Sequence, residues 1–256
     1  MNGIFIADLI VYLILLPLAI YNFITHRWTG FLPWYFTIVF CGARIAGGAL
    51  GIHDNSSLAP NIIQSVAITP LILGVDGLTH EARVHRYPSQ HSFLNWTVVT
   101  VTSVAMIAAI GLSIEGAINI FQHDGNGSSR DFAFWKAGSA LMMAVWGFEL
   151  FWAVYSIAPS RRAKMGSGGA GYQGSTVLLR GSLVALIFIG IRVIYALVAV
   201  ATGREDLNPV YGKTVVRVVL MFLPEALATI VMLLVGFKTR HLRALKRSNR
   251  LSLGEN

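Results

Sequence analysis

Residues 176–201 read TVLLRGSLVALIFIGIRVIYALVAVA, and this stretch decides the class of the protein. A helix needs about 20 predominantly apolar residues to cross a bilayer. This segment exceeds that length and carries only two charged side chains, Arg180 and Arg192. Six further stretches have the same character, so we expect seven membrane crossings. The expected spans are 5–25, 33–52, 58–80, 94–119, 133–157, 176–201 and 213–236.

The composition of the 256-residue chain agrees with an all-α, polytopic membrane bundle. Hydrophobic residues make up 55% of the chain and charged residues only 12%, which excludes a disordered or ordinary soluble protein. The net charge of +8 does not indicate nucleic-acid binding, because the cations lie in short loops and in the C-terminal tail. The single cysteine, Cys41, excludes a disulfide framework. No pattern of residues indicates a metal ion or another cofactor.

We expect one seven-helix transmembrane domain, residues 1–237, followed by a basic cytosolic tail, residues 238–256. With the N-terminus outside, the cytosolic segments hold 12 Lys and Arg residues and the outer segments hold 4. The positive-inside rule therefore predicts an N-out, C-in orientation. Two acceptor sequons, at Asn55 and Asn126, then fall in outer loops and are predicted glycosylation sites. A third sequon, at Asn95, falls at a cytosolic helix edge and is predicted to stay unmodified.

A weak internal similarity links the second and third spans to the sixth and seventh. Arg44 is followed after 32 residues by Asp76, and Arg192 after 33 residues by Glu225. This spacing is typical of a 3+1+3 parallel repeat, the plan of some small transporters. The shared composition of membrane helices is the alternative explanation.

Several ionisable side chains lie inside the expected spans, where a central charge costs roughly 2.5–3.5 kcal/mol. Because six lipid-facing charges are implausible at that cost, we expect these side chains to meet inside the bundle. One interpretation is a polar pocket that binds, moves or protonates a ligand. The other is a set of interhelical ion pairs that fixes the packing. The candidate ligand-binding residues are Arg44, Asp76, Glu149, Arg192, Arg217 and Glu225.

Two of these residues, Glu149 and Glu225, are also candidates for catalysis. Aromatic residues occupy positions 146, 148, 151 and 152 around Glu149. An acid in such an apolar setting suits proton donation. The structural alternative is that Glu149 hydrogen-bonds a neighbouring helix while the aromatic rings face lipid.

Other polar features receive structural interpretations. Asp76, His80 and Arg83 share a helix face at the end of the third span, which favours a solvated, salt-linked helix end. Asp8 lies near the outer boundary, where an exposed charge is tolerated. The glycine-rich segment 166–174 lacks the ending of a phosphate-binding loop and favours a flexible linker.

Small residues in the second span indicate close helix packing. Gly47 and Gly51 form a Gly-x-x-x-Gly pair, and such residues let helix backbones approach each other. Arg44 on the same helix is then expected to lie at a crowded helix crossing and not in lipid.

The string Ala43–Leu50, together with Pro224, Glu225 and the apolar run to Gly236, resembles a family of fungal seven-helix integral membrane proteins of unknown function. The resemblance spans nearly the whole chain and implies a fungal endomembrane or plasma-membrane protein. Fungal membrane-bound meroterpenoid cyclases are similar in length and helix number. Their Trp-x-x-Asn-Tyr and Asn-x-x-Trp-Glu strings are absent here, so that similarity is one of architecture.

The leading interpretation is a membrane protein that binds or translocates a small apolar or amphipathic molecule through a charged intramembrane pocket. An acid-initiated, terpene-cyclase-like enzyme of secondary metabolism and a divergent seven-helix receptor are the alternatives. The expected partners are a small-molecule ligand and membrane lipid, with no nucleic acid. The endoplasmic reticulum or the plasma membrane is the expected location.

Overall fold

A computed structural model describes residues 2–26, 30–53, 59–87, 92–122, 128–158, 161–207 and 212–240. These residues contain helices and no strand, which confirms the all-α class. The helices are α1 (Asn2–His26), α2 (Phe31–His53), α3 (Ala59–Val66), α4 (Ile68–Arg86), α5 (Ser92–Gln122), α6 (Ser129–Ile157), α7 (Arg161–Thr202), the 3-10 helix η1 (Glu205–Leu207), α8 (Thr214–Arg217), the π-helix η2 (Val218–Phe222) and α9 (Leu223–Thr239).

Seven helical segments are long and apolar enough to cross a membrane, as the sequence predicts. Each of α1, α2, α5, α6 and α7 supplies one span. The third span joins α3 to α4, and the seventh joins α8, η2 and α9. The protein is therefore an integral, multi-pass membrane protein. Large apolar side chains such as Ile14, Phe151 and Leu234 are more than 60% exposed on the outward faces, where lipid replaces water as the solvent.

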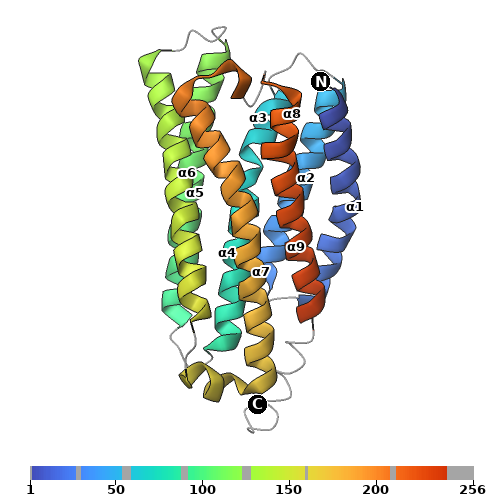
Figure 1. Ribbon diagram of the computed structural model, residues 1–256, viewed down its shortest axis with the longest axis vertical. Coiled ribbons are helices and arrows are strands. Elements are labelled where there is room, and N and C mark those ends of the chain that lie inside the picture. The colour runs from blue at the N-terminus through green and yellow to red at the C-terminus, as the bar shows by residue number, and fades with distance from the viewer. Residues whose placement is uncertain are drawn as a thin grey trace.

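The helices run up and down between two ends, which we call the upper end, where α1 begins in Figure 1, and the lower end, where α9 ends. The α1–α2 pair forms one side of the bundle and the α5–α6 pair forms the other. Between them lies α4, which packs mainly against α7 and α2. Because it is surrounded, α4 buries 17 of its 19 residues, although it carries more ionisable groups than any other span.

Prolines interrupt two of the spans. Pro70 has no N–H to donate to the carbonyl of Val66, and the third span breaks there at Ala67, between α3 and α4. In the seventh span the π-helix η2 comes immediately before α9, and Pro224 lies in the first turn of α9. By contrast, Pro17 lies within the continuous helix α1.

Glycines set the closest helix contacts. A Cβ atom on Gly48 would lie 2.9 Å from the carbonyl oxygen of Phe5, so α2 meets α1 at this point. Gly51 also faces Phe5, whereas Gly47 faces Gln64 on α3. The expected close packing of α2 is observed. However, Gly47 and Gly51 contact different helices, so the two glycines do not form one interface.

Two expectations about helix boundaries need correction, and the predictions for two sequons and for most of the tail fall outside the described residues. The segment 166–174 is part of α7 and is helical, so the interpretation as a flexible linker was wrong. The third span continues as helix to Arg86 instead of ending near residue 80. The sequons at Asn55 and Asn126, and the tail from residue 241 onward, lie outside the described residues.

Candidate functional site

The charged residues nearest the middle of the spans converge on Glu225 of α9. Its Oε1 accepts a hydrogen bond of 2.9 Å from Nε of Arg192 on α7. Its Oε2 contacts the Arg44 guanidinium on α2. Arg44 also lies 3.6 Å from Oδ1 of Asp8 on α1, measured from its Nη1. We call these four residues the charge cluster; none of them is more than 2% exposed.

The charge cluster joins four helices across the upper half of the bundle. A buried carboxylate or guanidinium loses its hydration, and only close opposite charges and hydrogen bonds offset that loss. The two arginines and two carboxylates here meet in such contacts. Phe40 and Tyr12 complete the surroundings of Arg44, whose guanidinium carbon lies 5.7 and 5.9 Å from the two ring centres. Arg44, Arg192 and Glu225 are buried in the interior of the bundle, as the sequence predicts.

Asp8 was missed as a member of this cluster. Its position near the start of the first span favoured a charge at the membrane boundary, yet the residue is fully buried. Besides contacting Arg44, it accepts a 2.6 Å hydrogen bond from Gln64 on α3. One signal was available in the sequence, because Asp8 is the only acidic residue in the first span.

Arg217 lies close to the charge cluster, within electrostatic range of Asp8. Its Nη2 donates a 3.1 Å hydrogen bond to Oδ1 of Asn61 on α3. The sequence places Arg217 two helical turns before Glu225, which suggests one shared face. The π-helix η2 lies between these two residues and changes the register of the helix, so their side chains take different partners.

Asp76 and Glu149 form a second, separate site. The Asp76 carboxyl on α4 accepts a 2.9 Å hydrogen bond from the Thr102 hydroxyl on α5, and it lies within hydrogen-bonding reach of the Glu149 carboxyl on α6. We call Asp76 and Glu149 the carboxyl pair. The structure therefore divides the six predicted residues between two places and does not bring them into one pocket.

The pairing of charges follows the proposed repeat in its second half, where Arg192 contacts Glu225, but not in its first half. Arg44 contacts Glu225 in the seventh span, whereas Asp76 in the third span contacts Glu149 in the fifth. Two repeats with their own internal ion pairs would instead join Arg44 to Asp76. The 3+1+3 repeat stays a prediction.

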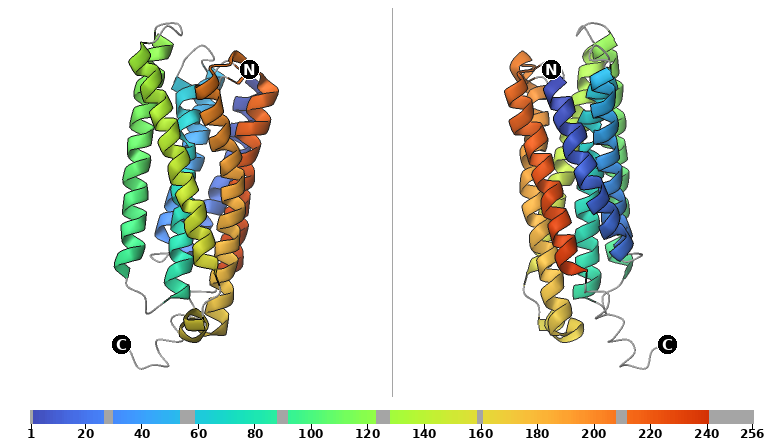
Figure 2. Two further views of the ribbon diagram at one scale, coloured as in Figure 1. Left: turned by 60° about the vertical axis from the view of Figure 1, so that its left-hand side comes forward. Right: turned by 90° about the vertical axis from the view of Figure 1, so that its right-hand side faces the viewer.

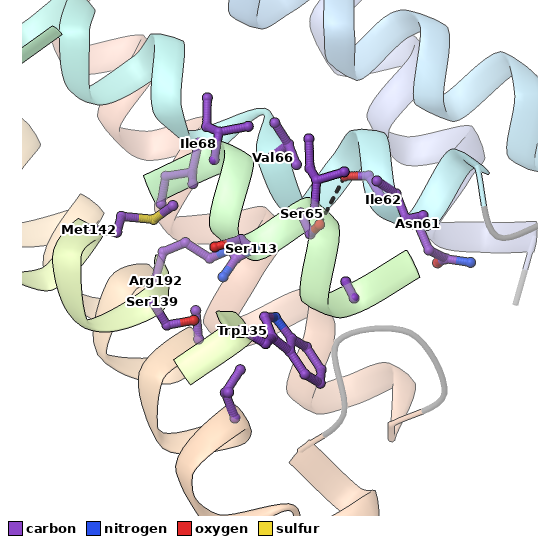
Figure 3. Close-up of a pocket in the computed structure, with 15 residues that line it drawn as sticks. Asn61, Ile62, Ser65, Val66, Ile68, Ser113, Trp135, Ser139, Met142 and Arg192 are labelled. Carbon is purple, nitrogen blue, oxygen red and sulfur yellow. Dashed lines mark hydrogen bonds between the residues drawn. The ribbon is translucent and has the colours of Figure 1, made fainter. Parts of the chain in front are cut away.

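A cavity of about 50 Å³ lies beside the charge cluster, enclosed by α3, α4, α5, α6 and α7 (Figure 3). Most of its wall is apolar, and the serines at positions 65, 113 and 139 add hydroxyl groups. The lining residues are Asn61, Ile62, Ser65, Val66, Ile68, Ile110, Ser113, Ile114, Ala117, Trp135, Ser139, Met142, Arg192, Ala196 and Val200.

Arg192 is the residue that links the cavity to the charge cluster. Its Nε is engaged by Glu225, and the side chain also forms part of the cavity wall. In the described residues, no protein acceptor engages its two Nη atoms. A guanidinium presents five N–H donors in a planar fork that matches carboxylates and phosphates. The cavity is thus a largely apolar space with one cationic residue among those that line it.

The lower end of α4 is also buried, which corrects the expectation of a solvated helix end. His80 is 8% exposed, and its ring centre lies 5.0 Å from that of Trp96. Arg83 donates to Asn95 and Ser156 and packs on the ring of Trp152, 4.1 Å from its centre. These contacts tie α4 to α5 and α6, so the polar residues of this end connect helices.

A further polar contact at the lower end joins α1, α4 and α9. Nδ1 of His26 lies 2.9 Å from Oε1 of Glu81, and its Nε2 lies 3.1 Å from the carbonyl oxygen of Gly236. Within the described residues, no group of three or more His, Cys, Asp and Glu side chains is arranged to hold a metal ion.

Over residues 1–242 the chain matches a protein family described as a domain of unknown function, DUF7702. The protein belongs to this family. Membership in a family of unknown function agrees with the resemblance in the sequence, and the fungal source stays a prediction. No curated protein and no solved structure matches the chain. The family description names no activity, substrate or compartment.

Proposed function

We propose that the protein binds a small amphipathic molecule with an anionic head in the cavity beside Arg192. The observation that supports this most directly is the position of Arg192, which contacts Glu225 through Nε and is one of the residues that line the cavity. A carboxylate or sulfonate in the cavity would accept hydrogen bonds from the Nη atoms. Charge-assisted bonds of this kind are roughly twice as strong as neutral ones.

The walls of the cavity fit the remainder of such a ligand. Isoleucine and valine side chains from α3, α4, α5 and α7 surround the space, and they favour an alkyl chain over a polar group. At about 50 Å³, the cavity exceeds the roughly 10–15 Å³ that a single water needs. A short chain of a few carbon atoms therefore suits it better than a bulky ring system.

The alternative of an acid-initiated enzyme has less support from the same geometry. Neither Glu149 nor Glu225, the two candidate proton donors, lines the cavity. Both oxygens of Glu225 contact arginines, an arrangement that favours a carboxylate over a protonated acid. A substrate in this cavity would meet a guanidinium and three hydroxyl groups.

The test is binding of hexanoate and of hexanol, its neutral counterpart, to the full chain in lipid nanodiscs. We expect hexanoate to bind at least tenfold more tightly than hexanol, after subtraction of binding to empty nanodiscs. Arg192→Gln should abolish this preference because it removes the cation. Arg180→Gln, an exposed arginine on the same helix, should retain it. Equal binding of the two probes to the unmodified protein would contradict the proposal.

A second variant is needed because Arg192→Gln also disturbs the charge cluster and could lose binding simply by unfolding. Ala196→Leu places a larger side chain in the cavity one helical turn from Arg192 and changes no residue of the charge cluster. We expect it to weaken both probes without changing the thermal midpoint by more than a few degrees. Unchanged binding in this variant would place the ligand elsewhere.

Binding and translocation are separated by measuring uptake into sealed vesicles. Hexanesulfonate is a suitable probe because it stays ionised and does not cross lipid unaided. A carrier would let hexanesulfonate enter the vesicles down its concentration gradient. Arg192→Gln would stop this uptake. A protein that only binds would show no uptake above that of empty vesicles.

For the orientation, we propose an outer N-terminus and a cytosolic C-terminus in the endoplasmic reticulum or plasma membrane. Arg83 and Arg86, two of the 12 cations assigned to the cytosolic side, are buried in α4 and do not lie in a loop. Without them the cytosolic side still holds 10 cations against 4, which supports the same orientation. Glycosylation at Asn55 or Asn126, detected by a mobility shift that Gln substitution removes, would support it; modification at Asn95 would invert it.

A further inference from the structure

The carboxyl pair lies in a part of the bundle that the proposed ligand site does not use. Asp76 is 2% exposed and Glu149 is fully buried. The two carboxyl groups lie within hydrogen-bonding reach of each other, and Thr102 donates to Oδ2 of Asp76. The three side chains come from α4, α5 and α6, so the contact forms where these helices meet.

Whether the two carboxyl groups can hydrogen-bond to each other depends on whether one of them carries a proton. Among the described residues, no hydroxyl, amide or guanidinium group donates a hydrogen bond to either oxygen of Glu149. An ionised carboxylate only accepts hydrogen bonds, whereas a protonated one donates one. The contact between Asp76 and Glu149 therefore becomes a hydrogen bond only when one of the two carboxyl groups carries a proton.

In the part of the chain that the structure describes, no cation forms a salt bridge with either carboxyl group. His80 and Arg83 follow Asp76 on α4 by one and two turns, but His80 packs on Trp96 and Arg83 donates to Asn95 and Ser156.

The neighbouring helices bring no further charge to this level of the bundle. Helix α7 has no ionisable side chain between residues 181 and 191, and α9 has none between residues 226 and 237. Between residues 37 and 43, α2 has only the thiol of Cys41. On α5 the group that contacts Asp76 is the uncharged hydroxyl of Thr102. Two adjacent carboxylates would thus repel each other with no positive group beside them.

The carboxyl pair lies below the cavity. Met142 lines the cavity and precedes Glu149 on α6 by seven residues, while Ile68 lines it and precedes Asp76 on α4 by eight. At 1.5 Å per residue, these separations are about 10 and 12 Å along the helix axes. Both helices run toward the lower end. The distance along α6 and the distance along α4 therefore place Glu149 and Asp76 at a similar depth below the cavity.

We propose that Asp76 and Glu149 form a membrane-embedded proton-binding site that holds a single proton between the two carboxyl groups. The O–H bond of one carboxyl donates to the other, and the pair then carries one negative charge. Release of the proton to water breaks that O–H bond and leaves two carboxylates. Their repulsion acts between α4 and α6, which have few other contacts because α6 packs mainly on α5 and α7. Proton release is therefore expected to loosen the α4–α6 contact.

The test is infrared difference spectroscopy of the full chain in nanodiscs, recorded between acidic and alkaline buffer. We expect a carbonyl-stretch band of a protonated carboxylic acid that shifts in heavy water and disappears at alkaline pH. Glu149→Gln and Asp76→Asn should each remove this band. In both variants a side-chain amide replaces the shared proton as the donor, so the remaining carboxyl stays ionised.

The matched control is Glu115→Gln, which makes the same chemical change at an exposed glutamate of α5 and should retain the band. Thermal midpoints show which variants are folded, and the amide replacements are chosen to retain the hydrogen bond. A band that persists in both folded variants would overturn the proposal, as would its absence from the unmodified protein throughout the pH range in which that protein stays folded. Hexanoate binding is expected to be unchanged in Glu149→Gln, so this proposal and the proposed function fail independently.

Discussion

Glu225 and Glu149 are the same side chain in two buried settings, and the contrast between them shows what determines the role of a charge in a membrane. Both are fully buried within membrane spans. Glu225 contacts two arginines from different helices, whereas Glu149 faces another carboxyl group. Burial alone therefore does not give a glutamate its role. The neighbouring helix does, because it supplies either a cation or a second acid.

The two settings also differ in which helices they join. The charge cluster connects α1, α2, α7 and α9, on one side of the bundle and at its centre. The carboxyl pair connects α4 to α6, with α5 contributing Thr102. A disturbance of the α5–α6 side should therefore reach the pair and the cavity while leaving the ion pairs of the cluster in place.

The largest expected effect separates the two glutamates by stability. Glu225→Gln leaves the guanidinium groups of Arg44 and Arg192 without their shared carboxylate, and breaking a buried ion pair in this way costs about 3–5 kcal/mol. Glu149→Gln should cost much less, because its amide donates to Asp76. Thermal midpoints of the two purified variants check this difference. Equal losses would mean that the two settings are energetically alike.

The double variant Arg192→Gln/Glu225→Gln sharpens that result. The two residues hydrogen-bond directly, so the loss from the double change should be smaller than the sum of the single losses. Strictly additive losses would show that the contact between Arg192 and Glu225 contributes nothing measurable to stability.

A smaller effect is expected from the contact between α5 and α6. A Cβ atom on Gly138 would lie 2.7 Å from the carbonyl oxygen of Ala109, whereas one on Gly147 would meet nothing within 4 Å. Gly138→Ala should therefore force α6 away from α5 and destabilise the protein by about 1–3 kcal/mol. Gly147→Ala on the same helix is the matched control and should be neutral or slightly stabilising. Similar thermal midpoints for both variants would contradict this account of the helix contact.

The smallest effect concerns the hydroxyl group that supports the carboxyl pair. Thr102→Val keeps the shape of the side chain and removes the hydrogen bond to Asp76, which should cost about 1 kcal/mol. Thr100 lies on the exposed face of α5 and bonds only to the backbone of its own helix, so Thr100→Val should change the thermal midpoint less. A larger loss from Thr100→Val would show that Thr102 does not support the pair.

The pairing of Arg192 with Glu225 could be anticipated because both lie near the middle of long apolar spans, where a charge requires a partner. The carboxyl pair could not. It depends on how α4 and α6 are rotated about their axes, and the uniformly apolar sequence of a membrane helix does not encode that rotation as an amphipathic pattern does in a soluble protein. Asp8 was missed for a related reason, since depth judged from sequence position does not show which side of α1 is covered by α2.

Length and apolar composition by themselves determined that this chain crosses a membrane seven times. A run of about 20 predominantly apolar residues is stable as a helix across the hydrocarbon core of a bilayer, where the helix satisfies its own backbone hydrogen bonds. They also determined that its internal charges would be buried. Only the tertiary structure decided which charges meet, since contacts between helices far apart in the chain follow from glycine-set distances and helix rotation. Glu225 thereby became the centre of an ion-pair cluster, and Glu149 became the partner of another acid.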